Sequence, residues 1–187
     1  MNLNLNNKKV VITGSSSGIG KEIAQFFVSE GCKVVINGRD ENKLLKTSSE
    51  IEGSLAVTGD VSSNIGATNL IQKSIELMGG IDILICNVGN GSSCLPGEEN
   101  FDEWQKVFNT NFFSATNTIE AAKKYLIESK GVIVCISSIC GLEIIKGAPI
   151  TYSVAKSALN TYIKSISKVL GENNVRINGI APGNIIF

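Results

Sequence analysis

The sequence predicts a single α/β domain in which helices cover both faces of a parallel, doubly wound sheet. Short β-branched runs alternate along the chain with longer segments whose apolar residues recur at 3.6-residue spacing. Runs without polar alternation are typical of strands buried on both faces of a parallel sheet, and right-handed crossovers between such strands give a doubly wound order. With 187 residues, three prolines and no internal repeat, we expect one domain over residues 1–187.

Six apolar runs are predicted to be strands, and four longer segments carry the helical pattern. The predicted strands span residues 9–13, 33–37, 54–58, 81–87, 131–137 and 175–180. The predicted helical segments span residues 18–30, 65–78, 101–130 and 152–170, the third of which holds more than one helical stretch. In the first of them, one helical face carries Ile19, Ile23, Phe26 and Phe27, as expected of a helix that packs on a sheet.

Composition limits the kinds of function. The 17 Lys and Arg residues balance 17 Asp and Glu residues, which argues against nucleic acid or an anionic membrane as a partner. The chain has no histidine, which excludes His-based triads, imidazole bases and most zinc sites, so we expect no metal. Five cysteines without a C-x-x-C pair are expected to be mostly buried thiols. Because the N-terminus lacks a signal-peptide pattern and no apolar run reaches the roughly 20 residues that span a bilayer, we expect a cytoplasmic protein.

The strongest local feature is the segment Thr13-Gly14-Ser15-Ser16-Ser17-Gly18-Ile19-Gly20, which joins the first predicted strand to the first predicted helix. Glycine tolerates positive φ and lets a ligand approach the backbone, and free N–H groups at a helix N-terminus attract phosphate. A strand, a glycine-rich turn and a helix in this order therefore predict a dinucleotide site. The residues expected to contact the cofactor here are Gly14, Ser16, Ser17, Gly18, Ile19 and Gly20. A tight turn that merely needs glycine is the alternative.

The spacing T-G-x-x-x-G-x-G resembles the signature of the short-chain dehydrogenase/reductase family, in its single-domain ketoreductase-like branch, and the resemblance continues along the whole chain. The further motifs are Asp60-Val61 after the third predicted strand, Asn87-Val88-Gly89 after the fourth, Asn111 at a helix start, Ser137-Ser138 after the fifth strand, Tyr152-x-x-x-Lys156, and Pro182-Gly183 after the sixth strand. The resemblance implies a Rossmann fold and an NAD(P)-dependent oxidoreductase that acts on a ketone or secondary alcohol. It also implies cofactor contacts from Asp60, Val61, Asn87, Gly89, Tyr152, Lys156, Pro182 and Gly183.

Tyr152 and Lys156 are four residues apart, so they lie on one face of a helix. An ammonium beside a phenol lowers the pKa of the phenol, as general acid–base catalysis at neutral pH requires. By the resemblance, Tyr152 exchanges a proton with the substrate oxygen, and Lys156 also binds the nicotinamide ribose. Ser138 hydrogen-bonds the same oxygen, since its position in the Ile-Ser-Ser stretch favours it over Ser137, and Asn111 holds a water that links Lys156 to solvent. A Y-x-x-x-K pair taken alone is more often part of an ordinary solvated helix face.

The end of the second predicted strand favours NADP(H) over NAD(H). NAD-preferring dinucleotide folds carry an acid there, whereas an arginine accommodates the 2′-phosphate of NADP. In this chain Gly38 stands where the resemblance expects the acid, and Arg39 follows it. A guanidinium holds phosphate with two parallel hydrogen bonds. The alternative is that Asp40 pairs with Arg39 at the start of the next helix.

The last expectations concern the end of the chain and the assembly. By the resemblance, a threonine that contacts the nicotinamide stands where this chain has Phe187, and family members continue into a substrate lid, a further helix and a seventh strand. The chain is therefore either part of a longer enzyme or a naturally short one that lacks the lid and last strand. The same analogy implies a homodimer or tetramer through the helices at 111–129 and 152–170. A non-catalytic nucleotide sensor and an inactive truncated dehydrogenase are the alternatives to a working oxidoreductase.

Overall fold

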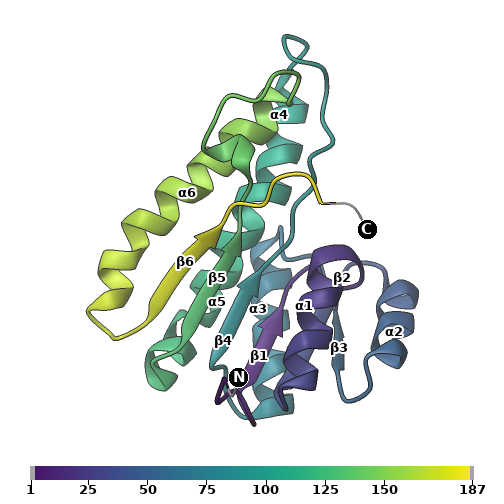
Figure 1. The fold of residues 1–187 in the computed structure, drawn as a ribbon, viewed down its shortest axis with the longest axis vertical. Helices are drawn as coiled ribbons and strands as arrows, with labels where there is room; N and C mark the ends of the chain where they lie inside the picture. The colour runs from purple at the N-terminus through teal and green to yellow at the C-terminus, as the bar shows by residue number, and fades with distance from the viewer. Residues whose placement is uncertain (1–2, 186–187) are drawn as a thin grey trace.

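The computed structural model describes residues 3–185 and contains one six-stranded sheet with the order β3-β2-β1-β4-β5-β6 (Figure 1). All neighbouring strands in this sheet are parallel. The strands are β1 Lys9–Ile12, β2 Lys33–Gly38, β3 Leu55–Thr58, β4 Ile83–Cys86, β5 Val132–Ile136 and β6 Arg176–Ile180. Each lies within two residues of a predicted strand, so the predicted doubly wound α/β class is confirmed.

Six α-helices connect these strands. They are α1 Gly18–Ser29, α2 Glu41–Glu50, α3 Asn64–Met78, α4 Phe101–Phe108, α5 Ser114–Ser129 and α6 Ile150–Gly171, together with the π-helical turn η1 Asn109–Phe113 and the 3₁₀ turn η2 Ile139–Gly141. The apolar spacing does not reveal α2, because this helix is mostly polar. Its first turn is stabilised instead by Asp40, whose carboxylate accepts a hydrogen bond of 3.0 Å from the Lys43 backbone N–H. α6 begins two residues before the predicted start, at Ile150.

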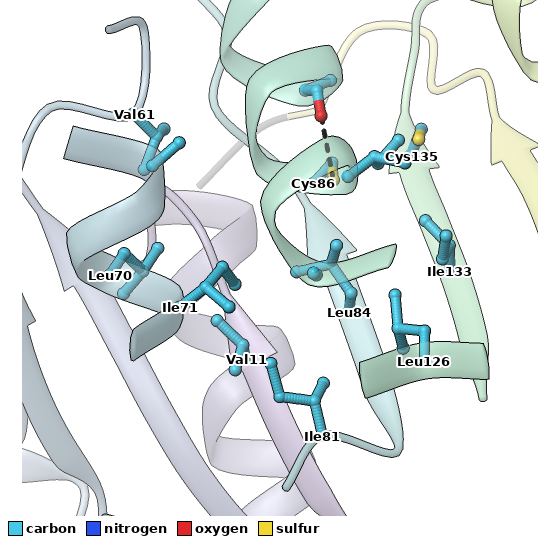
Figure 2. Packing of buried hydrophobic residues seen from close by; sticks show 14 of the residues in the cluster. Val11, Val61, Leu70, Ile71, Ile81, Leu84, Cys86, Leu126, Ile133 and Cys135 are labelled. Carbon is cyan, nitrogen blue, oxygen red and sulfur yellow. Dashed lines mark hydrogen bonds between the residues drawn. The ribbon is translucent and has the colours of Figure 1, made fainter. Parts of the chain in front are cut away.

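The strands supply two apolar layers, because successive side chains point to opposite faces of the sheet. On one face, Val10 and Ile12 belong to the cluster that includes the buried Ala24 of α1 and Leu44 of α2. On the other face, Val11 of β1 lies in the cluster covered by α3, α5 and α6. Figure 2 shows part of this second layer, in which the labelled core side chains include Val11, Leu70, Ile71, Leu84, Leu126 and Ile133. Burial on both faces explains why the strand runs lack polar alternation.

Three of the five cysteines are core residues. Cys86 of β4 and Cys135 of β5 are register partners in one apolar cluster, and Cys32 belongs to the other. The Cys86 sulfur lies 4.0 Å from the Ala115 carbonyl oxygen, as the dashed line in Figure 2 marks. The adjacent Cys135 thiol and burial together hold the pKa of Cys86 well above its usual value, so this side chain is a neutral apolar residue. Within residues 3–185, no helix is long and apolar enough to span a bilayer.

The strand order reverses between β1 and β4, and this reversal positions the site. The chain leaves β1 through α1 toward β2, whereas β4 lies on the other side of β1 and is reached through α3. The two crossovers lie on opposite faces, so the loops that follow β1 and β4 diverge at the carboxyl edge of the sheet. A crevice at such a reversal is the usual ligand site of an open α/β sheet.

Candidate active site

A cavity of about 910 Å³ lies at the carboxyl edge of the sheet. Residues that follow each of the six strands line it. Those among them that the sequence predicts as site residues are Gly14, Ser16, Ser17, Gly18, Ile19, Arg39, Asp60, Val61, Asn87, Gly89, Ser138, Tyr152, Lys156, Pro182 and Gly183. The fold therefore gathers into one cavity residues that are up to 169 positions apart (Gly14 to Gly183).

The glycine turn has the backbone geometry that the sequence predicts. Gly14 and Gly18 have φ values of +62° and +55°, in the left-handed region that favours glycine. A methyl group at Gly14 would lie 3.0 Å from Val88 Cγ2, so the turn also requires a residue without a side chain. At the start of α1, Ser17 makes no side-chain capping hydrogen bond, which leaves the first backbone N–H groups of the helix available to an anion. The turn therefore fits a pyrophosphate.

Gly20, which the sequence predicts as a cofactor contact, is not among the residues that line the cavity. A methyl group at this position would lie 2.5 Å from both the Asn87 Nδ2 atom and the Gly14 carbonyl oxygen. Asn87 Nδ2 donates hydrogen bonds to the Gly14 carbonyl (2.9 Å) and to the Thr13 carbonyl (3.1 Å). The absence of a side chain at Gly20 thus lets α1 pack closely against the Gly14 carbonyl and the Asn87 side chain, which together hold the turn.

Two cations lie at the β2 end of the cavity. Arg39 is exposed, and its Nη1 atom lies 3.8 Å from Asp60 Oδ2. Asp40 caps α2, so the carboxylate that pairs with Arg39 is that of Asp60. Burial raises the pKa of Asp60, but hydrogen bonds from Ser62 and the charge of Arg39 outweigh this effect and lower the pKa overall. Lys43, which belongs to no sequence motif, also lines the cavity and donates a hydrogen bond of 3.0 Å to Ser17 Oγ.

Lys156 is the buried cation of the site. Its side chain comes from α6, the residue is only 2% exposed, and Nζ donates a hydrogen bond of 2.8 Å to the Ile136 carbonyl. A methyl group at Gly89 would lie 3.0 Å from this Nζ atom, so the glycine after β4 makes room for the ammonium. Burial lowers the pKa of Lys156 to about 8.

The pKa of Tyr152 shifts in the direction opposite to the sequence prediction. Burial raises this pKa above its usual value, although a hydrogen-bonding interaction with the Ser138 side chain opposes the effect. The Lys156 Nζ atom lies 5.8 Å from the centre of the Tyr152 ring and directs a hydrogen bond to the Ile136 carbonyl. The ammonium therefore does not produce the lowered pKa that the helical spacing suggests, and Tyr152 is a neutral phenol at neutral pH.

Asn111 does not begin a helix, contrary to the sequence prediction. It lies in η1, within one continuous helical stretch from α4 to α5, and it is buried beneath the cavity instead of lining it. Its Nδ2 atom donates to the carbonyls of Asn90 and Val107 (3.1 Å each), and its Oδ1 atom accepts from the Asn90 backbone N–H at 2.9 Å. The side chain fastens the loop after β4, and one acceptor position on Oδ1 has no partner among these bonds.

The hydroxyl of Ser137 is the one buried side-chain polar atom without a hydrogen-bond partner among residues 3–185. It lines the cavity beside Ser138. Lys106 and Thr110, one helical turn apart, line the cavity as well. Only their orientation toward the cavity distinguishes these residues from ordinary polar residues of a helix, and the sequence does not encode that orientation in any motif. Phe187, where the resemblance expects a threonine, lies outside the described residues.

Comparisons of the sequence with a family model and with curated proteins point to the same family. The family model described as short chain dehydrogenase matches residues 8–186. An uncharacterized oxidoreductase of Staphylococcus saprophyticus is 33% identical over 187 aligned positions, which cover 97% of this chain and 80% of the relative.

Solved structures of similar proteins agree with this family. A short-chain dehydrogenase/reductase of unknown function from Caenorhabditis elegans, solved with cofactor, has a TM-score of 0.90 and 30% identity, covering 96% of this chain and 70% of its own. The L-sorbose reductase of Gluconobacter frateurii, complexed with NADPH and L-sorbose, has a TM-score of 0.94 and 29% identity. That alignment covers 100% of this chain and 73% of the reductase.

Proposed function

Since the chain belongs to the short-chain dehydrogenase/reductase family, we propose that it is an NADP(H)-dependent oxidoreductase that acts on a ketone or secondary alcohol, with Tyr152 as the general acid/base. The observation that carries this proposal is the single cavity in which a phosphate-binding turn, an exposed arginine and a Ser138–Tyr152–Lys156 group come together. A nucleotide sensor needs the turn, but it does not need the second group.

The cofactor is held, in this proposal, by the turn from Gly14 to Ile19, by Asp60 and Val61, and by the residues after β4 and β6. When bound, the nicotinamide supplies or accepts the hydride. Gly38 supports the preference for NADP(H), because a methyl group there would lie 3.0 Å from Ser16 Oγ and no acid precedes Arg39. Arg39 and Lys43 then offer two cations to the 2′-phosphate of NADP(H).

The neutral phenol of Tyr152 suits carbonyl reduction. A raised pKa keeps the proton on Tyr152 at neutral pH, where it is available to the substrate oxygen as charge develops there. Ser138 donates a second hydrogen bond to the same oxygen and so helps to stabilise that charge. Lys156, placed beside Tyr152 by the helix, holds the nicotinamide ribose. The free acceptor position of Asn111 holds the water through which Lys156 exchanges protons with solvent.

The test is to follow the absorbance of NADPH with a panel of ketones, and of NADP⁺ with the matching alcohols. L-sorbose, ethyl acetoacetate and cyclohexanone cover a sugar, a β-keto ester and an apolar ring, and L-sorbose is first because the Gluconobacter neighbour binds it. Turnover supports the proposal. Tight binding of NADPH without turnover of any compound favours a sensor, and tighter binding of NADH than of NADPH contradicts the cofactor preference.

A further inference from the structure

Three polar side chains that do not line the cavity form a continuous hydrogen-bonded chain next to Tyr152. Ser93 Oγ lies 2.9 Å from Glu103 Oε1 and 2.6 Å from Thr151 Oγ1. Ser93 belongs to the loop between β4 and α4, Glu103 to α4, and Thr151 to the first turn of α6. Thr151 is completely buried and immediately precedes Tyr152. The chain of bonds therefore ties three separate segments together at the residue before the proposed acid.

The direction of these bonds is fixed by the carboxylate. A hydrogen bond from Ser93, followed by the charge and hydrogen bond of Lys106, lowers the pKa of Glu103, so the side chain is ionised at neutral pH and only accepts hydrogen bonds. Ser93 has one hydroxyl proton and donates it to Glu103 Oε1 at 2.9 Å, the nearer and charged acceptor, whereas the Cys94 sulfur lies 3.9 Å away. The remaining bond must then run from the Thr151 hydroxyl to Ser93. Glu103 thus determines the orientation of both hydroxyl groups.

The same loop forms a wall over the phenol. A methyl group at Gly91 would lie 3.9 Å from the Cζ atom of Tyr152. On one side of Gly91 the loop is fastened by Asn111, which bonds both backbone polar groups of Asn90. On the other side it is fastened at Ser93. The N-cap residue of α6, Pro149, provides no side-chain cap, and the bond between Thr151 Oγ1 and Ser93 Oγ ties the first turn of this helix to the loop.

We propose that Glu103 is a positioning residue for the proton transfer. Acting through Ser93, its carboxylate holds Thr151, and with it the first turn of α6 and the loop wall, so that Tyr152 keeps one orientation toward the substrate oxygen. The inference rests on the proposed function for the role of Tyr152, whereas the tether itself does not depend on any activity. Misplacement of a catalytic group by a fraction of an ångström is enough to lower turnover.

The first experiment measures amide hydrogen exchange of the first turn of α6 in the full chain. Glu103→Ala and Thr151→Val are expected to speed exchange at residues 153–155, the first whose N–H groups are hydrogen-bonded within the helix, by about tenfold relative to the unmodified protein. Thr151→Ser keeps the hydroxyl and is expected to keep the protection. Glu120→Ala is the control, because Glu120 pairs with Lys123 at the same spacing as Glu103 with Lys106, and within residues 3–185 its hydrogen bonds are to Lys123 and not to a loop hydroxyl. Unchanged exchange in both Glu103→Ala and Thr151→Val overturns the proposal.

The second experiment measures turnover with the fastest ketone of the panel, together with the Kd of NADPH. Glu103→Ala and Thr151→Val are each expected to lower kcat about tenfold and to leave the Kd of NADPH within about twofold. Because both act through one chain of bonds, the double variant is expected to be no slower than the slower single variant. If the decrease in kcat of the double variant equals the product of the two single decreases, the two residues act independently and the proposal is contradicted. If no ketone is turned over, the proposed function fails, and the exchange experiment still decides whether the tether exists.

Discussion

At the scale of single residues, Lys156 is the one charged residue that is buried among residues 3–185. It is buried to 2% exposure, and the protein offers its ammonium the Ile136 carbonyl but no carboxylate within ion-pair distance among residues 3–185. A lysine in such a place is costly for folding, because the charged form loses most of its hydration. A buried charge of this kind in a cavity marks a candidate functional group, and the proposed contact with the nicotinamide ribose gives the ammonium such a role.

We expect this cost to appear in the pH dependence of stability. The folded pKa of Lys156, about 8, lies below its value of 10.5 in the unfolded chain, so between these values the unfolded state binds more protons. The free energy of unfolding contributed by Lys156 therefore rises as pH rises from about 8 toward 10. Urea unfolding at several pH values, compared between the protein and Lys156→Met, measures this difference. If the free energies of unfolding of the two proteins change with pH in parallel between about 8 and 10, the burial of the Lys156 charge is contradicted.

Tyr152→Phe removes only the hydroxyl of the proposed acid. We expect turnover to fall at least about 100-fold, which is the lower bound for loss of a general acid, while the Kd of NADPH changes little because the ring is kept. Tyr125→Phe on α5 removes a hydroxyl that does not line the cavity and serves as the control. Near-normal turnover in Tyr152→Phe would refute the assignment.

Arg39→Ala tests the cofactor preference. Loss of an exposed guanidinium that pairs with the 2′-phosphate is expected to raise the Kd of NADPH about tenfold and to leave the Kd of NADH unchanged, since NADH carries no phosphate there. Arg176→Ala at the start of β6 removes the other arginine of the chain and should change neither value. Fluorescence titration with both cofactors measures the ratio. An equal loss for both cofactors would place Arg39 outside the 2′-phosphate site.

At the scale of elements, the glycines of two helices show how position changes the meaning of one residue type. Gly20 lies in the first turn of α1, where a side chain would collide with the Asn87 side chain and the Gly14 carbonyl. Gly171 ends α6, and no atom lies within 4 Å of where its methyl group would be. The first glycine is required by packing, whereas the second only adds entropy to the unfolded chain.

This contrast gives a paired prediction. Gly20→Ala is expected to lower the free energy of unfolding by about 1–3 kcal/mol, as overpacking does, and to weaken NADPH binding because the turn shifts. Gly171→Ala is expected to raise the free energy of unfolding by about 0.5–1 kcal/mol without affecting NADPH. Urea unfolding of both variants checks the signs. If both substitutions change the free energy of unfolding equally, the backbone around Gly20 shifts to accept a methyl group at no cost, and the close packing of α1 on the turn is not required.

Elements also differ in how far the sequence predicts them. The strands follow from their short apolar runs, because they are buried on both faces of the sheet. The helices α1, α3 and α6 follow from apolar spacing, because each packs an apolar stripe against the sheet. α2 is mostly polar and depends on the cap at Asp40, so spacing alone does not find it. The π-helical turn around Asn111 is likewise absent from any local pattern, since it arises where α4 and α5 join as one stretch over α6 and the loop after β4.

For the whole molecule, the cavity joins the carboxyl ends of strands from both halves of the sheet. A ligand that fills it contacts both halves and binds only the folded chain, so it must stabilise the fold. We expect NADPH at about 100 times its Kd to raise the free energy of unfolding by about 2.7 kcal/mol and the Tm by about 5–10 °C. Thermal unfolding with and without NADPH measures the shift. The Arg39→Ala variant should show a smaller shift at the same concentration, and no shift in the unmodified protein would mean that the cavity does not take the cofactor.

The sequence by itself determined the class of fold, the glycine turn and the motifs that identify the family, because these depend on periodicity and on residues at fixed short spacing. The tertiary structure decided what distant residues do to one another. It gave Arg39 the Asp60 carboxylate as a partner, packed Gly20 against the Asn87 side chain and the Gly14 carbonyl, raised the pKa of Tyr152 by burial, and joined Ser93, Glu103 and Thr151. Hydration and contact depend on which segments the fold brings together, and short-range spacing carries no information about that.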